Sequence, residues 1–373
     1  MTKAILFDVD GVFLDESRCF DVSALTVFEL LYDQSYLNLD SSIDLKSVSE
    51  SEIQEIRQEI FNNDITLNRL KSLGLNSNWD MLFVVFAVHF AALLKSLPKD
   101  VREHFLNQTH IHQETLKNLG YKMTVTKIDN ELPLRFVEKV SKGKEAIYQD
   151  LKRYVSEFLD TTAVHLFDIQ SSLWMLCQEI YQEWYLGSDL YAKVEGKTPR
   201  TKFKKGYIYQ EQTLAPVDQI KALLTYLTEK NYTLGIATGR PRTETIVPFE
   251  SLGLLKYFDV NHIATASEVL KTEMNYPELR PLAKPNPFTY ITSYLGNDEK
   301  RYEDYATHQE QRFKEETITI VGDSLADLFS AQKLGTHFIG TLTGLKGELA
   351  AEELKSHGAT HLVKNVLDIK AFF

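Results

Sequence analysis

A short apolar run that ends in two carboxylates constrains this chain more than any other feature. Residues 4–12 read AILFDVDGV, which is typical of a buried β-strand that stops at Asp8, Asp10 and Gly11. Strands buried on both faces belong to parallel sheets, and open α/β sheets bind ligands at the carboxyl ends of their strands. Because side chains alternate along a strand, Asp8 and Asp10 are expected to point the same way, one as nucleophile or metal ligand and the other as acid or base.

The same residues also fit an ordinary turn after a strand. Asp and Gly dominate turns for reasons that have nothing to do with catalysis. The motif therefore carries a functional interpretation only if other polar residues are expected to gather beside it.

Length and composition narrow the class of protein. The chain has 373 residues, of which 43% are hydrophobic, so it can bury a substantial core and is expected to hold two domains. Its formal net charge of −11 disfavours non-specific binding to nucleic acid or to an anionic membrane. Two cysteines match neither a disulfide framework nor a metal site, and no signal peptide is expected. We expect a cytoplasmic protein without nucleic-acid or membrane partners, whose oligomeric state stays open.

Helical periodicity dominates residues 22 to 190, where few glycines or prolines interrupt the pattern. The longest apolar stretch, residues 81–94, is too short for a membrane span and is typical of a buried helix. Polar loops are expected before and after this region, over residues 13–21 and 191–209. The helices expected within it cover residues 22–32, 50–61, 66–73, 79–97 and 173–185.

Strands alternate with helices after Pro216, which predicts a doubly wound parallel sheet in an α/β fold. The N-terminal run supplies the first strand, so the helical region is expected to be an all-α domain inserted after that strand. We assign residues 1–15 and 210–373 to the α/β core and residues 16–209 to the inserted domain. The later strands are expected at 232–237, 263–264, 317–321, 337–340 and 361–363, and the later helices at 217–230, 244–252, 326–334 and 348–357.

Polar residues follow the expected strands or precede the expected helices of the core. Together they offer carboxylates, a hydroxyl and an ammonium group, which is what Mg²⁺-assisted phosphoryl transfer through an aspartyl-phosphate requires. Backbone N–H groups at Gly239 add donors for a phosphoryl group. These polar residues are Asp8, Asp10, Thr238, Lys284, Asp323 and Asp327.

Four motifs in order make the chain resemble the phosphatase-like branch of the haloacid dehalogenase superfamily. The first, Asp-x-Asp-Gly-(Thr/Val), matches residues 8–12, and the second, a Ser or Thr that closes a hydrophobic strand, matches Thr238. The third, a lysine in a Lys-Pro-x-Pro setting, matches Lys284, and the fourth, Gly-Asp-Ser-x-x-Asp, matches residues 322–327. The resemblance implies the family's Rossmann-like core with a helical cap inserted after the first motif.

The resemblance also implies a reaction on the carboxylates of the first motif. Asp8 would attack phosphorus and become the aspartyl-phosphate, while Asp10 would protonate the leaving oxygen and then activate water. Mg²⁺ would be held by Asp8, by the backbone carbonyl of Asp10 and by Asp323. The implied activity is that of a Mg²⁺-dependent phosphoric monoester hydrolase.

Further residues acquire binding roles through the same resemblance. Thr238 and Lys284 would bind the phosphoryl oxygens, with Gly239 and Arg240 contributing to the substrate site. Asp327 would orient Lys284 or a metal-bound water. The cap resembles those of phosphoglycolate phosphatases and β-phosphoglucomutases but is far longer, so the substrate is expected only to be a small phosphorylated metabolite.

Several features keep two interpretations. Arg240 contacts the substrate or caps a helix, and the basic residues of segment 193–205 steer an anionic substrate or, as favoured, form a solvated loop. His110 and His112 alternate like two metal ligands, but without a visible third ligand surface histidines are favoured. Arg18 is expected on a solvated surface.

Three functions remain for the whole chain. The preferred one is the phosphohydrolase, and the second is a phosphomutase on the same scaffold. The third is a binding or regulatory protein whose large helical domain serves a macromolecular partner, which the presence of all four motifs disfavours. The charged segment 297–316 is expected to be an exposed helix or a mobile loop without an assigned role.

Overall fold

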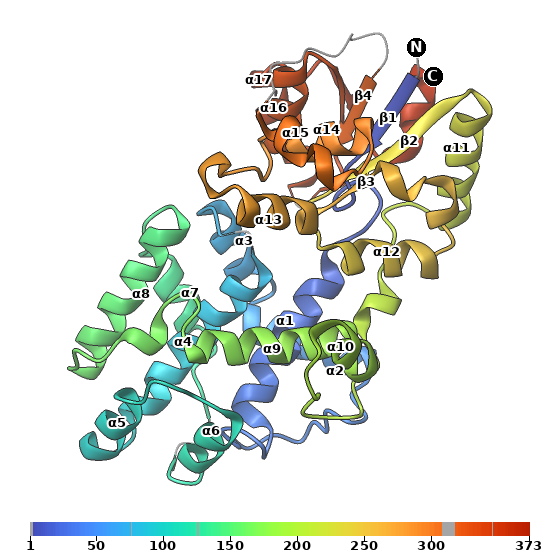
Figure 1. The fold of residues 1–373 in the computed structure, drawn as a ribbon. Coiled ribbons are helices and arrows are strands. Elements are labelled where there is room, and N and C mark those ends of the chain that lie inside the picture. Colours follow the sequence, from blue (N-terminus) through green and yellow to red (C-terminus); the bar gives the residue numbers. More distant parts are fainter. Residues whose placement is uncertain (1–2, 76, 125–126, 308–317, 345) are drawn as a thin grey trace. The chain divides into compact units, whose positions relative to one another are not determined.

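The computed structural model describes residues 3–75, 77–124, 127–307, 318–344 and 346–373, and the chain divides into two compact units (Figure 1). One unit consists of Met1–Glu16 and Ile208–Phe373, and the other of Ser17–Tyr207. The first, which we call the α/β unit, is assembled from both ends of the sequence. The second, which we call the helical unit, is continuous in sequence.

The α/β unit contains one sheet with the strand order β3-β2-β1-β4-β5-β6 in the part of the chain that the structure describes. All five pairings are parallel. The first strand, β1 (Lys3–Phe7), lies between β2 (Tyr232–Ala237) and β4 (Ile318–Gly322), so the N-terminal run occupies the middle of the sheet. The predicted α/β fold with a doubly wound parallel sheet is confirmed.

The two faces of β1 explain why it reads as a continuous apolar run. Ile5 and Phe7 belong to one buried cluster, which also contains side chains of α11 and α12. Ala4 and Leu6 point to the opposite face and join a second buried cluster, with side chains from α14 to α17. A strand covered by helices on both faces has no solvent-facing side, so alternation of polar residues is absent from it.

Strands and helices alternate along the α/β unit. Most of the predicted elements are present with ends shifted by one or two residues. The remaining elements are α11 (Val217–Glu229), α12 (Arg242–Ser251), β3 (Ile263–Ala264), α13 (Ala266–Asn275), α14 (Phe288–Leu295), α15 (Tyr302–Thr307), α16 (Leu325–Leu334), β5 (His337–Thr341), α17 (Ala350–Ser356) and β6 (His361–Val363), with short 3-10 helices at Leu255–Tyr257, Val260–His262, Pro277–Leu279, Glu299–Arg301, Gly347–Leu349 and Val366–Phe372.

The helical unit is organised around three helices that pack on one another: α1 (Ser17–Tyr32), α4 (Asn78–Lys95) and α9 (Ser172–Leu186). Serine caps begin several of its helices, as at Ser49, whose hydroxyl accepts from the Glu52 N–H in a capping box. The other helices are α2 (Glu50–Phe61), α3 (Ile65–Ser72), α5 (Lys99–Leu106), α6 (Gln113–Gly120), α7 (Leu132–Val137), α8 (Lys144–Leu159) and α10 (Ser188–Glu195), with a 3-10 helix at His165–Phe167. A further 3-10 helix, Tyr207–Gln210, begins at the last residue of this unit and continues into the α/β unit.

Among the helices of the described residues, α4 alone is long and apolar enough to cross a membrane by length and composition. Burial identifies it instead as a core helix, because 78% of the window Asn78–Lys95 is buried inside the protein. The predicted buried helix at residues 81–94 is therefore confirmed.

The expected loop at residues 13–21 is wrong over its second half, because α1 begins at Ser17. Arg18 is buried rather than solvated, and its guanidinium lies 3.2 Å from Asp21 and 2.8 Å from Glu50. An arginine with two carboxylate partners no longer needs water, so a charged residue is tolerated in the first turn of a covered helix.

The basic segment 193–205 is not simply a solvated loop. The Lys204 ammonium is buried 2.8 Å from a carboxylate oxygen of Glu29, and Arg200 lies 2.8 Å from Glu183. Lys202 and Lys205 are exposed, as favoured for the whole segment. Sequence spacing does not reveal the buried pairs because their acids stand on distant helices.

The charged segment 297–316 is partly described. It starts with the 3-10 helix Glu299–Arg301 and continues into α15, whose Tyr302 and Tyr305 are buried against the α/β core. Residues 308–316 lie outside the described residues. The described part is therefore anchored to the sheet by aromatic side chains.

Candidate active site

Three of the predicted site residues follow neighbouring parallel strands. Asp8 follows β1, Thr238 follows β2 and Asp323 follows β4. The register pairs Phe7 with both Ile236 and Val321, so the three strand ends fall at the same edge of the sheet. Parallel pairing thus brings together residues more than 200 positions apart in sequence.

Lys284 joins the carboxylates from the loop before α14. Its ammonium nitrogen lies 3.0 Å from Oδ2 of Asp8 and 2.8 Å from Oδ1 of Asp327. Both carboxylates are also covered by the fold, so these ion pairs are only weakly screened by water. The structure therefore places the predicted lysine directly between two predicted aspartates.

Asp327 is fixed in the first turn of α16. Ser324 caps this helix in a capping box with Asp327, and the Ser324 hydroxyl also donates to Oδ2 of Asp327 at 2.7 Å. The Tyr290 hydroxyl donates to Oδ1 at 2.8 Å, beside Lys284. With both oxygens engaged by protein donors, Asp327 is suited to holding its neighbours in place.

Asp323 is enclosed by two glycines. A Cβ at Gly11 or at Gly344 would collide with the Asp323 carboxylate. Gly11 also has a φ of +71°, and its carbonyl accepts hydrogen bonds from Thr341 and Thr343. Only a residue without a side chain lets the loop after β1 approach this carboxylate so closely.

The electrostatics of the cluster are dominated by burial and by an excess of negative charge. Burial raises the pKa of Asp8 to about 7, against the attraction of Lys284. Burial, then the neighbouring charges of Asp327 and Asp8, raise the pKa of Asp323 well above its usual range. Burial opposes both members of the Lys284–Asp327 pair, yet their attraction raises the pKa of Lys284 and lowers that of Asp327. One lysine is too little positive charge for three aspartates.

The same three aspartates form a group able to ligate a cation. One carboxylate oxygen from each of Asp8, Asp323 and Asp327 lies within 4.8 Å of the other two. Within the described residues this is the one such group of three acidic, histidine or cysteine side chains. Hard oxygen donors of this kind suit Mg²⁺ or Ca²⁺ rather than softer metals.

Asp10 stands apart from this group and is held by Arg240. The Arg240 Nε donates to both oxygens of the Asp10 carboxylate, at 2.8 and 3.0 Å, and Nη2 lies 2.6 Å from Oδ1. Nη1 donates to the buried Glu211 at 2.8 Å. Arg240, expected to contact substrate or to cap a helix, has its guanidinium on these two carboxylates.

Thr238 and Gly239 form the turn after β2. The Thr238 N–H donates to the Ala264 carbonyl at 3.0 Å, and the Arg240 N–H donates to the Thr238 hydroxyl at 3.2 Å. No described atom lies within 4 Å of where a Cβ of Gly239 would stand. The turn is therefore anchored on one side and open at the glycine.

Two residues of the site had no signal in the sequence. Tyr290 lies in the first turn of α14, where its apolar spacing is that of a core residue, and the Lys284 ammonium lies 4.9 Å from the centre of its ring. Glu211 lies two residues beyond the expected loop at 191–209, where no element or site was predicted. A buried polar partner is recognised only when the fold shows what it faces.

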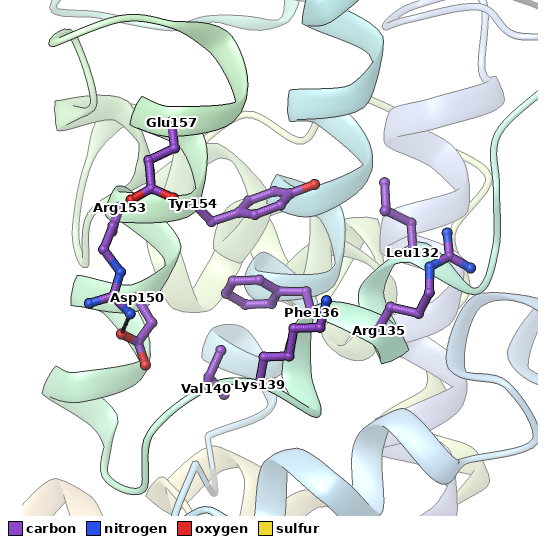
Figure 2. A pocket seen from close by; sticks show the side chains of 9 residues that line it. All are labelled: Leu132, Arg135, Phe136, Lys139, Val140, Asp150, Arg153, Tyr154 and Glu157. Carbon is purple, nitrogen blue, oxygen red and sulfur yellow. Dashed lines mark hydrogen bonds and ion pairs between the residues drawn. The ribbon is translucent and has the colours of Figure 1, made fainter.

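A surface pocket of about 300 Å³ lies in the helical unit (Figure 2). Its walls carry the aromatic rings of Phe136 and Tyr154 between charged side chains. Two of the lining charges are paired, Arg135 with Asp129 and Arg153 with an aspartate that also lines the pocket, and Lys139 and Glu157 complete the charged rim.

His110 and His112 are exposed, as favoured by the sequence. Their ring centres lie 6.5 Å apart. Both line a second pocket, of about 680 Å³, which His165 also lines. The three rings do not come close enough to form a metal-ligating group among the described residues.

Comparison with known proteins adds family information to this geometry. The family model of haloacid dehalogenase-like hydrolases matches residues 2–335. An X-ray structure solved by the Northeast Structural Genomics Consortium as target ZR25 is 52% identical, with a TM-score of 0.94 over 99% of this chain and 98% of that chain. No curated protein matches the chain.

More distant structures are similar over the whole length at low identity. A putative β-phosphoglucomutase from Thermotoga maritima is 14% identical, with a TM-score of 0.38 over 100% of this chain and 98% of that chain. A predicted phosphoglycolate phosphatase from Haemophilus somnus is 13% identical, with a TM-score of 0.41 over 100% and 97%.

Proposed function

The chain belongs to the haloacid dehalogenase-like hydrolase family, and on that premise we propose that it is a Mg²⁺-dependent phosphohydrolase of a small phosphorylated metabolite. The observation that carries the proposal is Lys284 between Asp8 and Asp327, beside Asp323, at one edge of the sheet. This arrangement supplies a nucleophile, a cation for the phosphoryl oxygens and ligands for a metal.

The residues present fit a magnesium ion. Three carboxylates gather around one lysine, and burial, followed by the neighbouring negative charges, raises the pKa of Asp8 and of Asp323, a cost that a bound divalent cation would relieve. Because Asp327 is engaged by Ser324 and Tyr290, we assign the ion to Asp8, Asp323 and the backbone carbonyl of Asp10. When bound, Mg²⁺ would offset charge on the transferring phosphoryl group.

In the first half of the proposed reaction, a carboxylate oxygen of Asp8 attacks phosphorus, and the bond to the leaving oxygen breaks. Asp10 gives its proton to that oxygen, and Asp8 carries the phosphoryl group. In the second half, water attacks phosphorus while Asp10 takes a proton from it. The Asp8–phosphorus bond breaks, and both residues return to their starting state.

Positive charge and donors around Asp8 are proposed to hold the phosphoryl oxygens. Lys284 is already 3.0 Å from the nucleophile. Thr238 and the Gly239 N–H follow the neighbouring strand, and Asp327 keeps the lysine in place. Donors fixed before the substrate arrives need little reorganisation as charge develops, which is the main source of such stabilisation.

We assign substrate selection to the helical unit, as a cap inserted after the first motif. The unit interrupts the α/β unit between Glu16 and Ile208, which is the place where the family carries its helical caps. Its size exceeds that of the caps it resembles, so the identity of the metabolite is left to experiment.

The test is phosphate release from a panel of phosphorylated metabolites with Mg²⁺, comparing wild type with Asp8→Asn. We expect Asp8→Asn to lower turnover by about 10⁴-fold or more, because it removes the nucleophile. Asp218→Asn on α11, a carboxylate that is 94% exposed, is the matched control and should keep full activity. EDTA should abolish release and added Mg²⁺ restore it.

Two outcomes would contradict the proposal. Equal release by wild type and Asp8→Asn would exclude Asp8 as nucleophile, and no release from any compound would exclude hydrolysis of this substrate class. Phosphate transfer between positions of one substrate, dependent on a bisphosphate activator, would instead identify a mutase.

A further inference from the structure

The Arg240 side chain contacts one carboxylate of the proposed site, that of Asp10. Its Nε and Nη2 face the Asp10 carboxylate, with three contacts between 2.6 and 3.0 Å. A guanidinium presents its donors in a rigid planar fork, so a two-point contact fixes both the position and the rotation of a carboxylate. A lysine at this position would fix neither.

The Arg240 guanidinium also contacts a second carboxylate, that of Glu211. Nη1 of Arg240 lies 2.8 Å from Oε1 of Glu211, whose side chain is 1% exposed, against 7% for Arg240. Nη1 also lies 3.4 Å from the carbonyl oxygen of Glu244, and the Arg240 carbonyl accepts from the Ala266 N–H at 2.9 Å. A buried ion pair resists rearrangement, because separating its two charges in the protein interior costs free energy.

The Asp10 side chain, in contrast, is only partly covered by the described residues. It is 32% exposed, which leaves room for other rotamers. Its backbone is fixed by the turn that follows, where the Gly11 N–H donates to the Leu14 carbonyl at 3.1 Å. The turn thus fixes the backbone position of Asp10, and Arg240 fixes the position of its carboxylate.

We propose that Arg240, held by Glu211, is a positioning residue that fixes the Asp10 carboxylate for proton transfer at the leaving oxygen. This inference rests on the proposed function, because it needs a leaving oxygen. It differs from a substrate contact, since Arg240 then acts on the reaction only through Asp10. The consequence is selective: a misplaced Asp10 harms substrates whose leaving group needs a proton and spares those whose leaving group departs as a stable anion.

The experiment compares an alkyl phosphate with p-nitrophenyl phosphate in the presence of Mg²⁺. We expect Arg240→Gln to lower kcat on the alkyl ester by about 100-fold, with a loss on the nitrophenyl ester that is about tenfold smaller and little change in KM. Arg240→Lys keeps the charge but not the fork and should show the same selectivity. In the background of Asp10→Asn, Arg240→Gln should cause no further loss, because the two changes act on one step.

A variant that removes both buried charges serves as the control for misfolding. Arg240→Gln leaves Glu211 buried without its cation, so the double variant Arg240→Gln, Glu211→Gln tests the same loss of the fork in a protein with no stranded charge. Crystal structures of the variants give a readout independent of turnover. The Asp10 carboxylate should occupy more than one rotamer there and a single one in wild type.

Equal losses on both esters, additivity with Asp10→Asn, or an unmoved Asp10 in the variant crystals would each overturn the positioning role. A rise in KM at unchanged kcat would identify a substrate contact instead. Failure of the proposed function looks different: wild type would then release no phosphate from either ester, or as much as Asp8→Asn, and the role of Arg240 would fall with it.

Discussion

Gly11 is the residue of the site at which the lack of a side chain has the largest consequences for the structure. The loop after β1 reaches Asp323 only because no Cβ stands between them, and its φ of +71° is a conformation that other residues rarely adopt. Two separate physical requirements therefore meet at one position. A substitution can distinguish them, since one acts on backbone strain and the other on the carboxylate.

We expect Gly11→Ala to weaken Mg²⁺ binding by about 10- to 100-fold, because the new methyl group displaces the Asp323 carboxylate. Its backbone strain should also cost about 1 kcal/mol of unfolding free energy. Metal titration by calorimetry and denaturant unfolding measure the two effects. Gly335→Ala is the control, since φ is +66° there and no described atom lies within 4 Å of the added Cβ.

Loss of stability without loss of Mg²⁺ affinity in Gly11→Ala would show that Asp323 relaxes away from the methyl group. Gly335→Ala should show the strain alone. The comparison therefore assigns the close approach, and not the turn conformation, to the metal site.

At the scale of elements, α4 shows how a helix can be apolar all round and still belong to a globular unit. Its Phe83, Phe86 and Phe90 are fully buried, as the helical spacing of aromatics predicts for a core helix. His89 is buried among them, and neither of its ring nitrogens has a hydrogen-bond partner among the described residues. Burial lowers the pKa of His89 from 6.5 to about 4.

This shift predicts how the helical unit responds to acid. The unfolded chain binds a proton at His89 below pH 6.5 and the folded chain only near pH 4, so stability is retained above pH 6.5 and is lost as the pH falls. We expect a loss of about 2 kcal/mol by pH 5 from this residue. Denaturant unfolding at pH 8 and at pH 5 measures it.

His89→Leu should remove that part of the pH dependence, whereas His110→Leu on the exposed surface should leave it unchanged. If wild type and His89→Leu lost the same free energy between pH 8 and pH 5, the ring would have to be protonated or solvated in the folded state, contrary to its burial.

At the scale of the whole molecule, the chain consists of two units with separate cores, and the proposed metal site belongs to one of them. Ligand binding stabilises only the structure that must be folded for the site to exist. All three tryptophans, Trp79, Trp174 and Trp184, lie in the helical unit. Tryptophan fluorescence therefore follows the unfolding of that unit alone.

We expect Mg²⁺ at 100 times its dissociation constant to stabilise the α/β unit by about 2.7 kcal/mol. Circular dichroism and calorimetry should show a transition that shifts with Mg²⁺, while the fluorescence transition stays in place. Asp323→Asn should abolish the shift. A fluorescence transition that moves together with the calorimetric one would mean that the two units unfold as one.

The sequence by itself determined the fold class and the main candidates of the site. An apolar run without alternation can be buried only between two layers, and acids at its end have no place except the edge of a parallel sheet. The elements 50–61, 232–237 and 361–363 have the predicted bounds because caps, glycines and prolines act over a few residues. The roles of these site residues stay predictions until the variants are measured.

Only the tertiary structure decided which partner each buried polar group has. Arg240 faces Asp10 across 230 positions, Tyr290 faces Asp327 across 37, and Lys204 is buried against Glu29. No local sequence pattern encodes such pairs. An arginine, tyrosine or lysine side chain can bind many different partners, and its neighbours in sequence do not show which one it will contact. Burial then selects one partner, since a polar group removed from water must find its hydrogen bond within the protein.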